Sequence, residues 1–143
     1  MQPQIDHLQI TVKDFERAVS FYDQLMPILG YDLSLKNQGR VEANDFDVVE
    51  YFHPVLTFGI NSPRKEFKND EVHRRTPGSV HHIAFRAESN EEVDKLYPLI
   101  KAIGANIVEP PQFYPQHGEN YYALFFKDLD GIKLEIMFEG KTK

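Results

Sequence analysis

The sequence predicts an α+β fold made of two tandem modules, each consisting of one strand, one helix and then three further strands. The first observation is an internal repeat, because residues 5–10 and 80–85 share one layout: apolar, polar, histidine, apolar, small or polar, apolar. His7 and His82 therefore occupy matched places in the two modules. The second observation is that a stretch with the 3.6-residue apolar period of a helix follows each of these segments. Short alternating or apolar runs, typical of strands, complete each half.

Module one is expected over residues 4–61 and opens with a strand over residues 5–12. Asp14 is a suitable N-cap for the helix that follows, and Gly30 supplies its C-terminal stop. Pro27 is expected to kink or interrupt the last turn of this helix. The later elements of module one are predicted as a short strand over residues 31–35, a turn at 37–39, and strands over 48–52 and 55–60.

A charged connector with a helical turn is expected over residues 62–79, with its charges facing solvent or with the segment acting as a lid. Module two is expected over residues 80–139, and the two modules together form a single domain, 1–143. Its helix is capped by Ser89, and Glu92 completes a capping box. Its strands are predicted over residues 80–87, 105–109, 121–127 and 132–138, with a loop at 110–118 and a tight turn at 128–131.

Composition excludes several classes of protein. The net charge of −6 argues against a nucleic-acid or anionic-membrane binder, because such proteins present a basic field. No apolar run approaches the ~20 residues that span a bilayer, and the N-terminal residues lack the basic-then-apolar order of a signal peptide. The chain has no cysteine, so it has neither disulfides nor thiolate ligands. We therefore expect a cytoplasmic protein with no nucleic-acid and no membrane partner.

Three residues predict a metal site. In the first strand of each module the apolar residues face the helix, so His7 and His82 point the other way. In the last strand Glu135 shares the face opposite the apolar residues, and the same reasoning turns it toward the histidines. A lone strand histidine is usually structural, but its repetition favours a metal or ligand site. Two imidazoles and one carboxylate form a facial set that suits Fe, Mn, Ni, Co or Zn and leaves positions open for substrate.

The other histidines are expected to be less important. His81 aligns with Asp6 and should face away from His82 as a solvent- or interface-facing neighbour. His53 and His73 have no partner in the repeat and are expected at the surface or in turns. His117 lies in a loop from which it could reach the site.

Several segments resemble the vicinal oxygen chelate superfamily, which includes glyoxalase I, extradiol dioxygenases, and bleomycin- and fosfomycin-resistance proteins. The matching stretches are residues 5–14, 21–22 ahead of 29–30, 82–85, and 128–131 followed by 134–135. The resemblance implies two βαβββ modules forming a curled mixed sheet around a central cleft, and often a homodimer. It places the divalent metal ion at His7, His82 and Glu135.

The chain departs from the family pattern in two places. Leu129 replaces the proline of the usual Asp-Pro-Asp-Gly turn. Thr57 occupies the position at which glyoxalase I carries a further carboxylate ligand, which also serves proton transfer, so a hemithioacetal isomerase is not favoured. Extradiol dioxygenases add an acid/base histidine and tyrosine, for which His117, Tyr121 and Tyr122 are the candidates.

The residues and the resemblance together predict a metal-dependent enzyme whose small substrate binds a divalent ion through its oxygens. Lyase, isomerase and ring-cleaving dioxygenase chemistry all stay open. Arg86 shares the face of His82 and could hold a substrate carboxylate, and Tyr122 shares the face of Glu135 only if the turn before the last strand has an even-length register. The predicted substrate-binding residues are Thr57, Arg86, His117 and Tyr122. The alternatives are a metal-free small-molecule binding or sequestration protein of the bleomycin-resistance type, and a regulatory domain.

Overall fold

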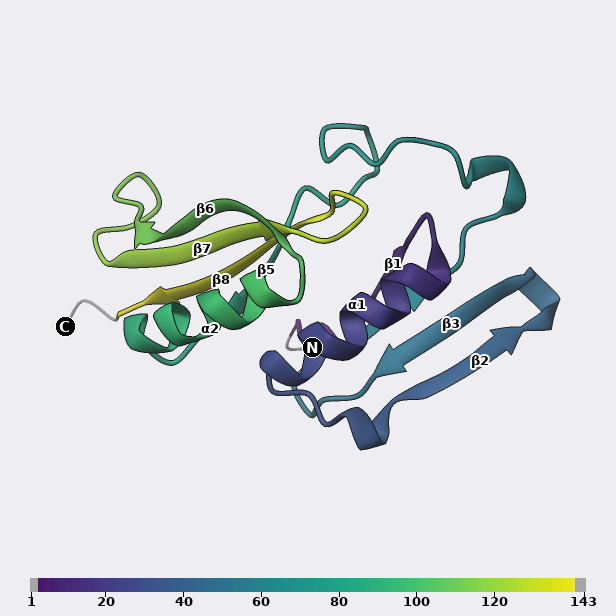
Figure 1. Ribbon diagram of the computed structural model, residues 1–143, viewed down its shortest axis with the longest axis horizontal. Coiled ribbons are helices and arrows are strands. Elements are labelled where there is room, and N and C mark those ends of the chain that lie inside the picture. The colour runs from purple at the N-terminus through teal and green to yellow at the C-terminus, as the bar shows by residue number, and fades with distance from the viewer. Residues whose placement is uncertain (1–2, 141–143) are drawn as a thin grey trace. The chain divides into compact units, whose positions relative to one another are not determined.

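The computed structural model describes residues 3–140 (Figure 1). The chain divides into two compact units, Met1–Glu71 and Val72–Lys143, which we call unit one and unit two and describe separately. Each unit contains one long helix and one four-stranded mixed sheet. The predicted α+β class with two tandem modules is therefore confirmed. In the part of the chain described, no helix has the length and apolar character needed to cross a bilayer.

The sheet of unit one has the strand order β1-β4-β3-β2. β1 runs parallel to β4, whereas β3 is antiparallel to both β4 and β2. The helix α1 buries its apolar side against the sheet, and the rings of Tyr22 and Phe58 lie 5.4 Å apart. As predicted, Asp14 caps the helix by accepting a hydrogen bond from the Arg17 amide at 3.1 Å. The elements are β1 (His7–Thr11), α1 (Phe15–Ile28), β2 (Asn37–Val41), β3 (Phe46–Tyr51) and β4 (Thr57–Asn61).

Three predictions for unit one are wrong. The strand expected at residues 31–35 is instead a 3-10 turn, Leu33–Leu35, because the Asp32 carboxylate accepts the Ser34 amide at 2.9 Å and caps the turn. The turn expected at 37–39 is part of β2, since pairing with β3 outweighs the local turn preference. Pro27 does not interrupt α1, because the Leu29 amide beyond it still reaches the Leu25 carbonyl at 3.1 Å.

Unit two repeats this arrangement, with the strand order β5-β8-β7-β6 and a parallel pairing between β5 and β8. Ser89 caps the helix as predicted, accepting the Glu92 amide at 3.2 Å. The reciprocal bond of the capping box is shifted by one residue, because the Glu92 carboxylate accepts from the Glu88 amide at 2.6 Å. The elements are β5 (Ile83–Arg86), α2 (Asn90–Ala102), β6 (Asn106–Phe113), β7 (Tyr121–Lys127) and β8 (Lys133–Glu139).

One loop of unit two is shorter than predicted. Residues 110–113 belong to β6, although they include two prolines. A proline is tolerated here because β6 is an edge strand, so the missing amide proton costs no ladder bond on its open side. The pairing of β6 with β7 shifts register on either side of Glu109, which accommodates this sequence.

The predicted turn at residues 128–131 is confirmed and does not need the proline that Leu129 replaces. The Asp128 carboxylate accepts the amides of Asp130 at 3.0 Å and of Ile132 at 2.8 Å. Gly131 adopts a φ of 89°, a conformation that favours glycine. Side-chain hydrogen bonds to the backbone therefore fix the turn that sets the register of β7 against β8.

Candidate functional site

The predicted ligand of unit one lies on the open face of its sheet. The register pairs Leu8 with Phe58, and Phe58 is fully buried against α1. Successive strand residues point to opposite faces, so His7 and its neighbour Thr57 lie side by side on the face away from the helix. The predicted direction of the His7 side chain is therefore the one found within unit one.

His7 is oriented by the residue before it. Its Nδ1 lies 2.8 Å from a carboxylate oxygen of Asp6, and its side chain is 60% exposed. Because a carboxylate only accepts, the proton of the neutral imidazole lies on Nδ1, and Nε2 of that form keeps the lone pair that binds a metal ion. A hollow of about 820 Å³ adjoins this end of β1 and is lined by Gln4, Ile5, Asp6, His53, Pro54, Val55, Leu56 and Thr57.

The central feature of unit two is a buried carboxylate. Glu135 lies on β8 with only 1% of its surface exposed. Its Oε1 accepts a hydrogen bond from the Tyr121 hydroxyl at 2.5 Å. Its Oε2 lies 3.4 Å from His82 Nε2. Since a buried charge is costly unless it is paired or bound to a cation, this geometry singles out Glu135 as a functional candidate.

His82 is held by a chain of polar contacts. Its Nδ1 lies 2.7 Å from His81 Nδ1, and His81 Nε2 lies 2.7 Å from a guanidinium nitrogen of Arg74. Arginine can only donate, so a neutral His81 accepts at Nε2 and donates from Nδ1 to His82. Desolvation, and then the Arg74 charge, lower the pKa of His81, which favours the neutral ring. His82 then presents Nε2–H to Glu135.

The expectation that His81 faces away from His82 is wrong, because the two rings are in contact with centroids 5.0 Å apart. In both units the residue before the histidine contacts its Nδ1 atom. Asp6 does so for His7, and His81 does so for His82. The repeat therefore includes the residue that orients each histidine.

By residue type the donor set suits a divalent cation, and Glu135 keeps one oxygen turned to His82. The Nδ1 atom of His7 is engaged as a donor, whereas that of His82 is engaged as an acceptor, so His82 would have to move its proton from Nε2 to Nδ1 before Nε2 could bind an ion. Among residues 3–140, no three His, Asp or Glu side chains gather as a preformed metal cluster. The predicted set takes His7 from unit one and the other two ligands from unit two, so it stays a prediction.

The predicted substrate-binding residues of unit two separate into two groups. Arg86 pairs with Met137 on the Glu135 face of the sheet and has no ion-pair partner among residues 3–140. The ring of His117 lies 5.4 Å from that of Tyr121 and thus reaches the tyrosine that holds Glu135. Tyr122 lies on the opposite face, because it pairs with Phe138 and donates its hydroxyl to Asp94 of α2 at 2.7 Å. The register condition for Tyr122 is not met, and Tyr121 takes the place predicted for it.

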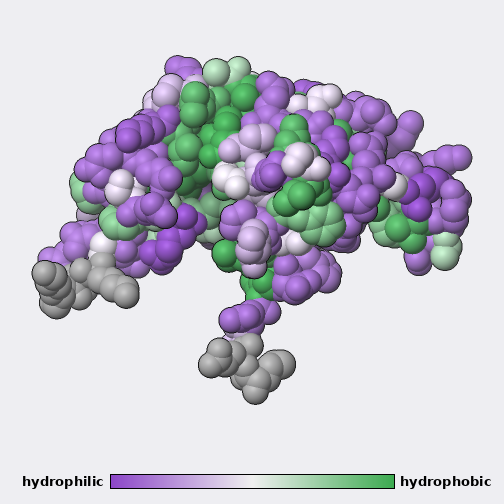
Figure 2. Space-filling model, turned by 90° about the horizontal axis from the view of Figure 1, so that it is seen from below, coloured by the Kyte–Doolittle hydropathy of each residue, from purple (hydrophilic) through white to green (hydrophobic). Residues whose placement is uncertain are grey.

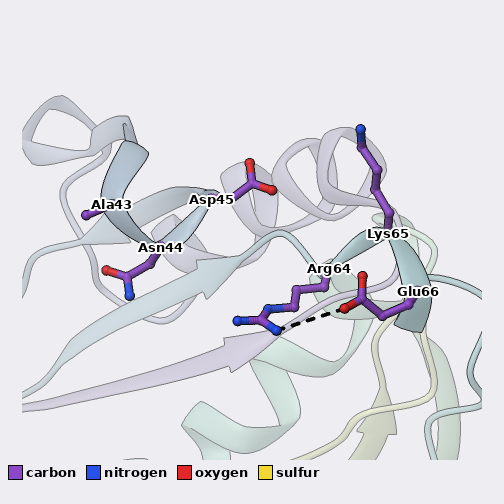
Figure 3. A pocket seen from close by; sticks show the side chains of 6 residues that line it. All are labelled: Ala43, Asn44, Asp45, Arg64, Lys65 and Glu66. Carbon is purple, nitrogen blue, oxygen red and sulfur yellow. Dashed lines mark ion pairs between the residues drawn. The ribbon is translucent and has the colours of Figure 1, made fainter.

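A second hollow in unit one is separate from these residues. It has a volume of about 360 Å³ and is lined by Ala43, Asn44, Asp45, Arg64, Lys65 and Glu66 (Figure 3). Arg64 and Glu66 point toward each other across a 3.9 Å ion pair, whereas Lys65 points away. An adjoining space is lined by Thr11 and Asn61, the last residues of β1 and β4. Thr11 lies four residues after His7 along β1, which corresponds to about 13 Å.

Comparison with known proteins identifies the family. Residues 4–136 match the model of the Glyoxalase/Bleomycin resistance protein/Dioxygenase superfamily. The chain belongs to this superfamily. It is 27% identical over 131 residues to the uncharacterized protein YqjT of Bacillus subtilis (strain 168), covering 92% of this chain and 95% of YqjT.

One further sequence relative and one structure with a similar fold have names that state an activity or a ligand. The chain is 25% identical over 142 residues to a 2,2',3-trihydroxybiphenyl dioxygenase of Sphingomonas paucimobilis, covering 96% of this chain but only 42% of the dioxygenase. It also resembles a crystal structure of a mutant of FosX, the genomically encoded fosfomycin resistance protein of Listeria monocytogenes, complexed with Mn(II) and 1S,2S-dihydroxypropylphosphonic acid. That likeness has a TM-score of 0.65 at 21% identity and covers 98% of this chain and 95% of FosX.

The strand register corrects the assignment of Thr57 to the place at which glyoxalase I carries its further carboxylate ligand. Glu135 pairs with Ala84, two residues after His82, whereas in unit one the residue two after His7 is Gln9, which pairs with Gly59. Gly59, and not Thr57, therefore stands at the place matched to Glu135. The place of the missing carboxylate is filled by the side chain of Gln9, because a Cβ added at Gly59 would lie 2.8 Å from Gln9 Cγ.

The sequence did not indicate the polar bridge that Gln9 forms between Glu50 and Asn61. The Gln9 amide donates to a Glu50 carboxylate oxygen at 3.3 Å, and Asn61 donates to the Gln9 carbonyl oxygen at 3.3 Å. The available signal for this bridge was Gly59 inside a strand, since a strand glycine often marks close approach of another group.

Lys133 is a second residue that the sequence did not indicate. It lies on the Glu135 face, with its Nζ 4.1 Å from the centre of the Phe125 ring.

We predict that Gly59→Ala displaces Gln9 from this bridge and lowers the free energy of unfolding by roughly 1 kcal/mol, the usual scale for overpacking and lost hydrogen bonds. Gly39→Ala is the matched control, because no atom lies within 4 Å of an added Cβ there. Urea unfolding of both variants measures the difference. Equal effects, or a penalty that persists in a Gln9→Ala background, would contradict the prediction.

Proposed function

We propose that the chain is a metal-dependent enzyme that holds a small, oxygen-bearing substrate against a divalent ion bound by His7, His82 and Glu135. The observation that carries this proposal is Glu135, 1% exposed, with Oε2 directed at His82 Nε2. A fully buried carboxylate held by one hydroxyl donor and a 3.4 Å contact with His82 Nε2 is only partly compensated, and a cation at Oε2 would compensate it further. Fe, Mn, Ni, Co and Zn all suit this ligand set, and the FosX complex with Mn(II) supports such an ion within the superfamily.

The bound ion would supply Lewis acidity, which stabilises negative charge that develops on a substrate oxygen. The protein's own residues then bind and orient the substrate. Arg86 and Lys133 lie on the Glu135 face without an ion-pair partner among residues 3–140, so they would attract an anionic substrate group. Thr57 and His117 lie near His7 and Tyr121 respectively, where they would line the substrate site.

The position matched to Glu135 in unit one limits the choice of reaction. Gly59 supplies no carboxylate there, and Glu50, on the same face, is tied to the Gln9 amide. A hemithioacetal isomerase that uses a carboxylate from each module is therefore disfavoured. Lyase and ring-cleaving dioxygenase chemistry keep their support, the latter from the dioxygenase relative.

The first test is the metal content of the purified protein. We expect wild type to retain a stoichiometric divalent ion, measured by mass spectrometry of the metals after dialysis, and Glu135→Ala to lose it. Asp94→Ala is the matched control, since Asp94 also accepts a tyrosine hydroxyl but lies on the helix side of the sheet. EDTA should lower the melting temperature of wild type and Asp94→Ala only, because a ligand at 100 times its Kd stabilises by about 2.7 kcal/mol.

A different result would favour the metal-free alternative. If wild type and Glu135→Ala hold equally little metal, and EDTA leaves both melting temperatures unchanged, the metal-enzyme proposal fails. Binding of an aromatic drug by that metal-free protein would then support sequestration of the bleomycin-resistance type.

We also propose that the chain forms a homodimer. Large apolar side chains are exposed on the single chain, including Ile5 at 70% and Val55 at 77%, and Figure 2 shows such apolar surface among polar residues. Exposed apolar surface of this kind favours association. Light scattering coupled to size-exclusion chromatography should give twice the 16.6 kDa chain mass. A monomer at all micromolar concentrations would contradict this proposal.

A further inference from the structure

Tyr121 is placed to control the ligand geometry of Glu135. It is the first residue of β7 and pairs with Glu139, which puts its side chain on the Glu135 face of the sheet. Its backbone is held on both sides, because its amide donates to the Gly118 carbonyl at 3.2 Å and its carbonyl accepts the Tyr114 amide at 2.8 Å. The position of the ring is therefore fixed by the closure of the loop before β7.

The ring itself is also confined. It packs against the buried cluster formed by Tyr114, Ala123, Phe125 and Met137. The imidazole of His117 lies 5.4 Å from it. These contacts direct the hydroxyl to Glu135 Oε1, where it donates a hydrogen bond of 2.5 Å. A hydrogen bond this short to a carboxylate is among the strong ones in proteins.

The two oxygens of Glu135 consequently have different surroundings. Oε1 is occupied by the Tyr121 hydroxyl, and Oε2 faces His82 Nε2 at 3.4 Å. A carboxylate can bind a metal ion through one oxygen or through both. With Oε1 engaged, Oε2 is the oxygen left to bind the proposed ion.

We propose that Tyr121 is a positioning residue that fixes Glu135 as a one-oxygen metal ligand. This inference rests on the proposed function, because it assumes that Glu135 binds an ion. Hydrogen bonds from neighbouring residues orient metal ligands, and their removal typically lowers metal affinity by about 10–100-fold.

The chain contains a matched control for this role. Tyr122 is the next residue, and its hydroxyl also donates to a carboxylate, that of Asp94, at 2.7 Å. It lies on the opposite face of the sheet, toward α2, so it cannot act on Glu135. Tyr121→Phe and Tyr122→Phe thus remove the same group from neighbouring residues with different surroundings.

The experiment measures Co(II) binding to the full chain by calorimetry and by the visible absorption of the bound ion. Tyr121→Phe should bind Co(II) about 10–100-fold more weakly than wild type. Its absorption spectrum should also change, because the freed Oε1 can join the coordination sphere. Tyr122→Phe should match wild type in both measurements, and melting in EDTA checks that both variants are folded.

The outcomes separate the two proposals. Absence of Co(II) binding by wild type overturns the proposed function and this inference together. Wild-type binding with an unchanged affinity and spectrum in Tyr121→Phe overturns this inference alone.

If Tyr121→Phe does not fold, wild type labelled with 13C at the ζ carbon of tyrosine provides the test. Zn(II) should then shift the Tyr121 resonance and leave that of Tyr122 in place, and an unmoved Tyr121 resonance would overturn the inference.

Discussion

The burial of one carboxylate within a β-sheet constrains much of unit two. Glu135 is on β8, an inner strand, so both neighbours of that strand must supply compensation. β5 leads from His82, and β7 begins with Tyr121, so the histidine and the hydroxyl donor approach from opposite sides. The parallel pairing of β5 with β8 is therefore needed for the site as well as for the fold.

At the matched pair of strand positions, each unit places one large and one small residue side by side, but the large residue is on a different strand in each unit. In unit two a small residue, Ala84, lies beside the large Glu135. In unit one the sizes are exchanged, because the large Gln9 lies beside Gly59. A neutral carboxamide held by Asn61 and Glu50 therefore lies where the repeat would otherwise put a second buried carboxylate. Within residues 3–140, this strand position therefore carries a buried carboxylate, only partly compensated by Tyr121 and His82, in unit two and not in unit one.

The sequence was sufficient for those parts of the fold that depend on local patterns. The repeat around His7 and His82, the caps Asp14 and Ser89, and the turn closed by Asp128 are all local, and the structure contains each of them. The errors at residues 31–35, 37–39 and 110–113 arose where side-chain capping or pairing with a distant strand decided the conformation.

The same distinction applies to the site residues. The choice between Tyr121 and Tyr122 depends on the register of β7 against β8, and a register is a property of two strands. The match of Glu135 with Gly59 likewise depends on parallel pairings that no single segment specifies. Contacts of His81 were missed for another reason, since β5 begins only at Ile83 and strand alternation does not apply before it.

The two histidines differ in how readily they can present Nε2. The Asp6 carboxylate already sets the Nδ1–H form of His7, whose Nε2 lone pair is available. His82 receives its hydrogen bond from His81, which Arg74 makes a donor, so its Nε2 proton faces Glu135. That proton partly compensates the buried carboxylate and keeps the pair aligned without a cation. A cation at Nε2 would require the proton of the His81–His82 contact to move to His82 Nδ1, because the ring would otherwise lose both of its protons. The Arg74 guanidinium opposes that shift, since it donates to His81 Nε2 and so keeps the proton of His81 on Nδ1.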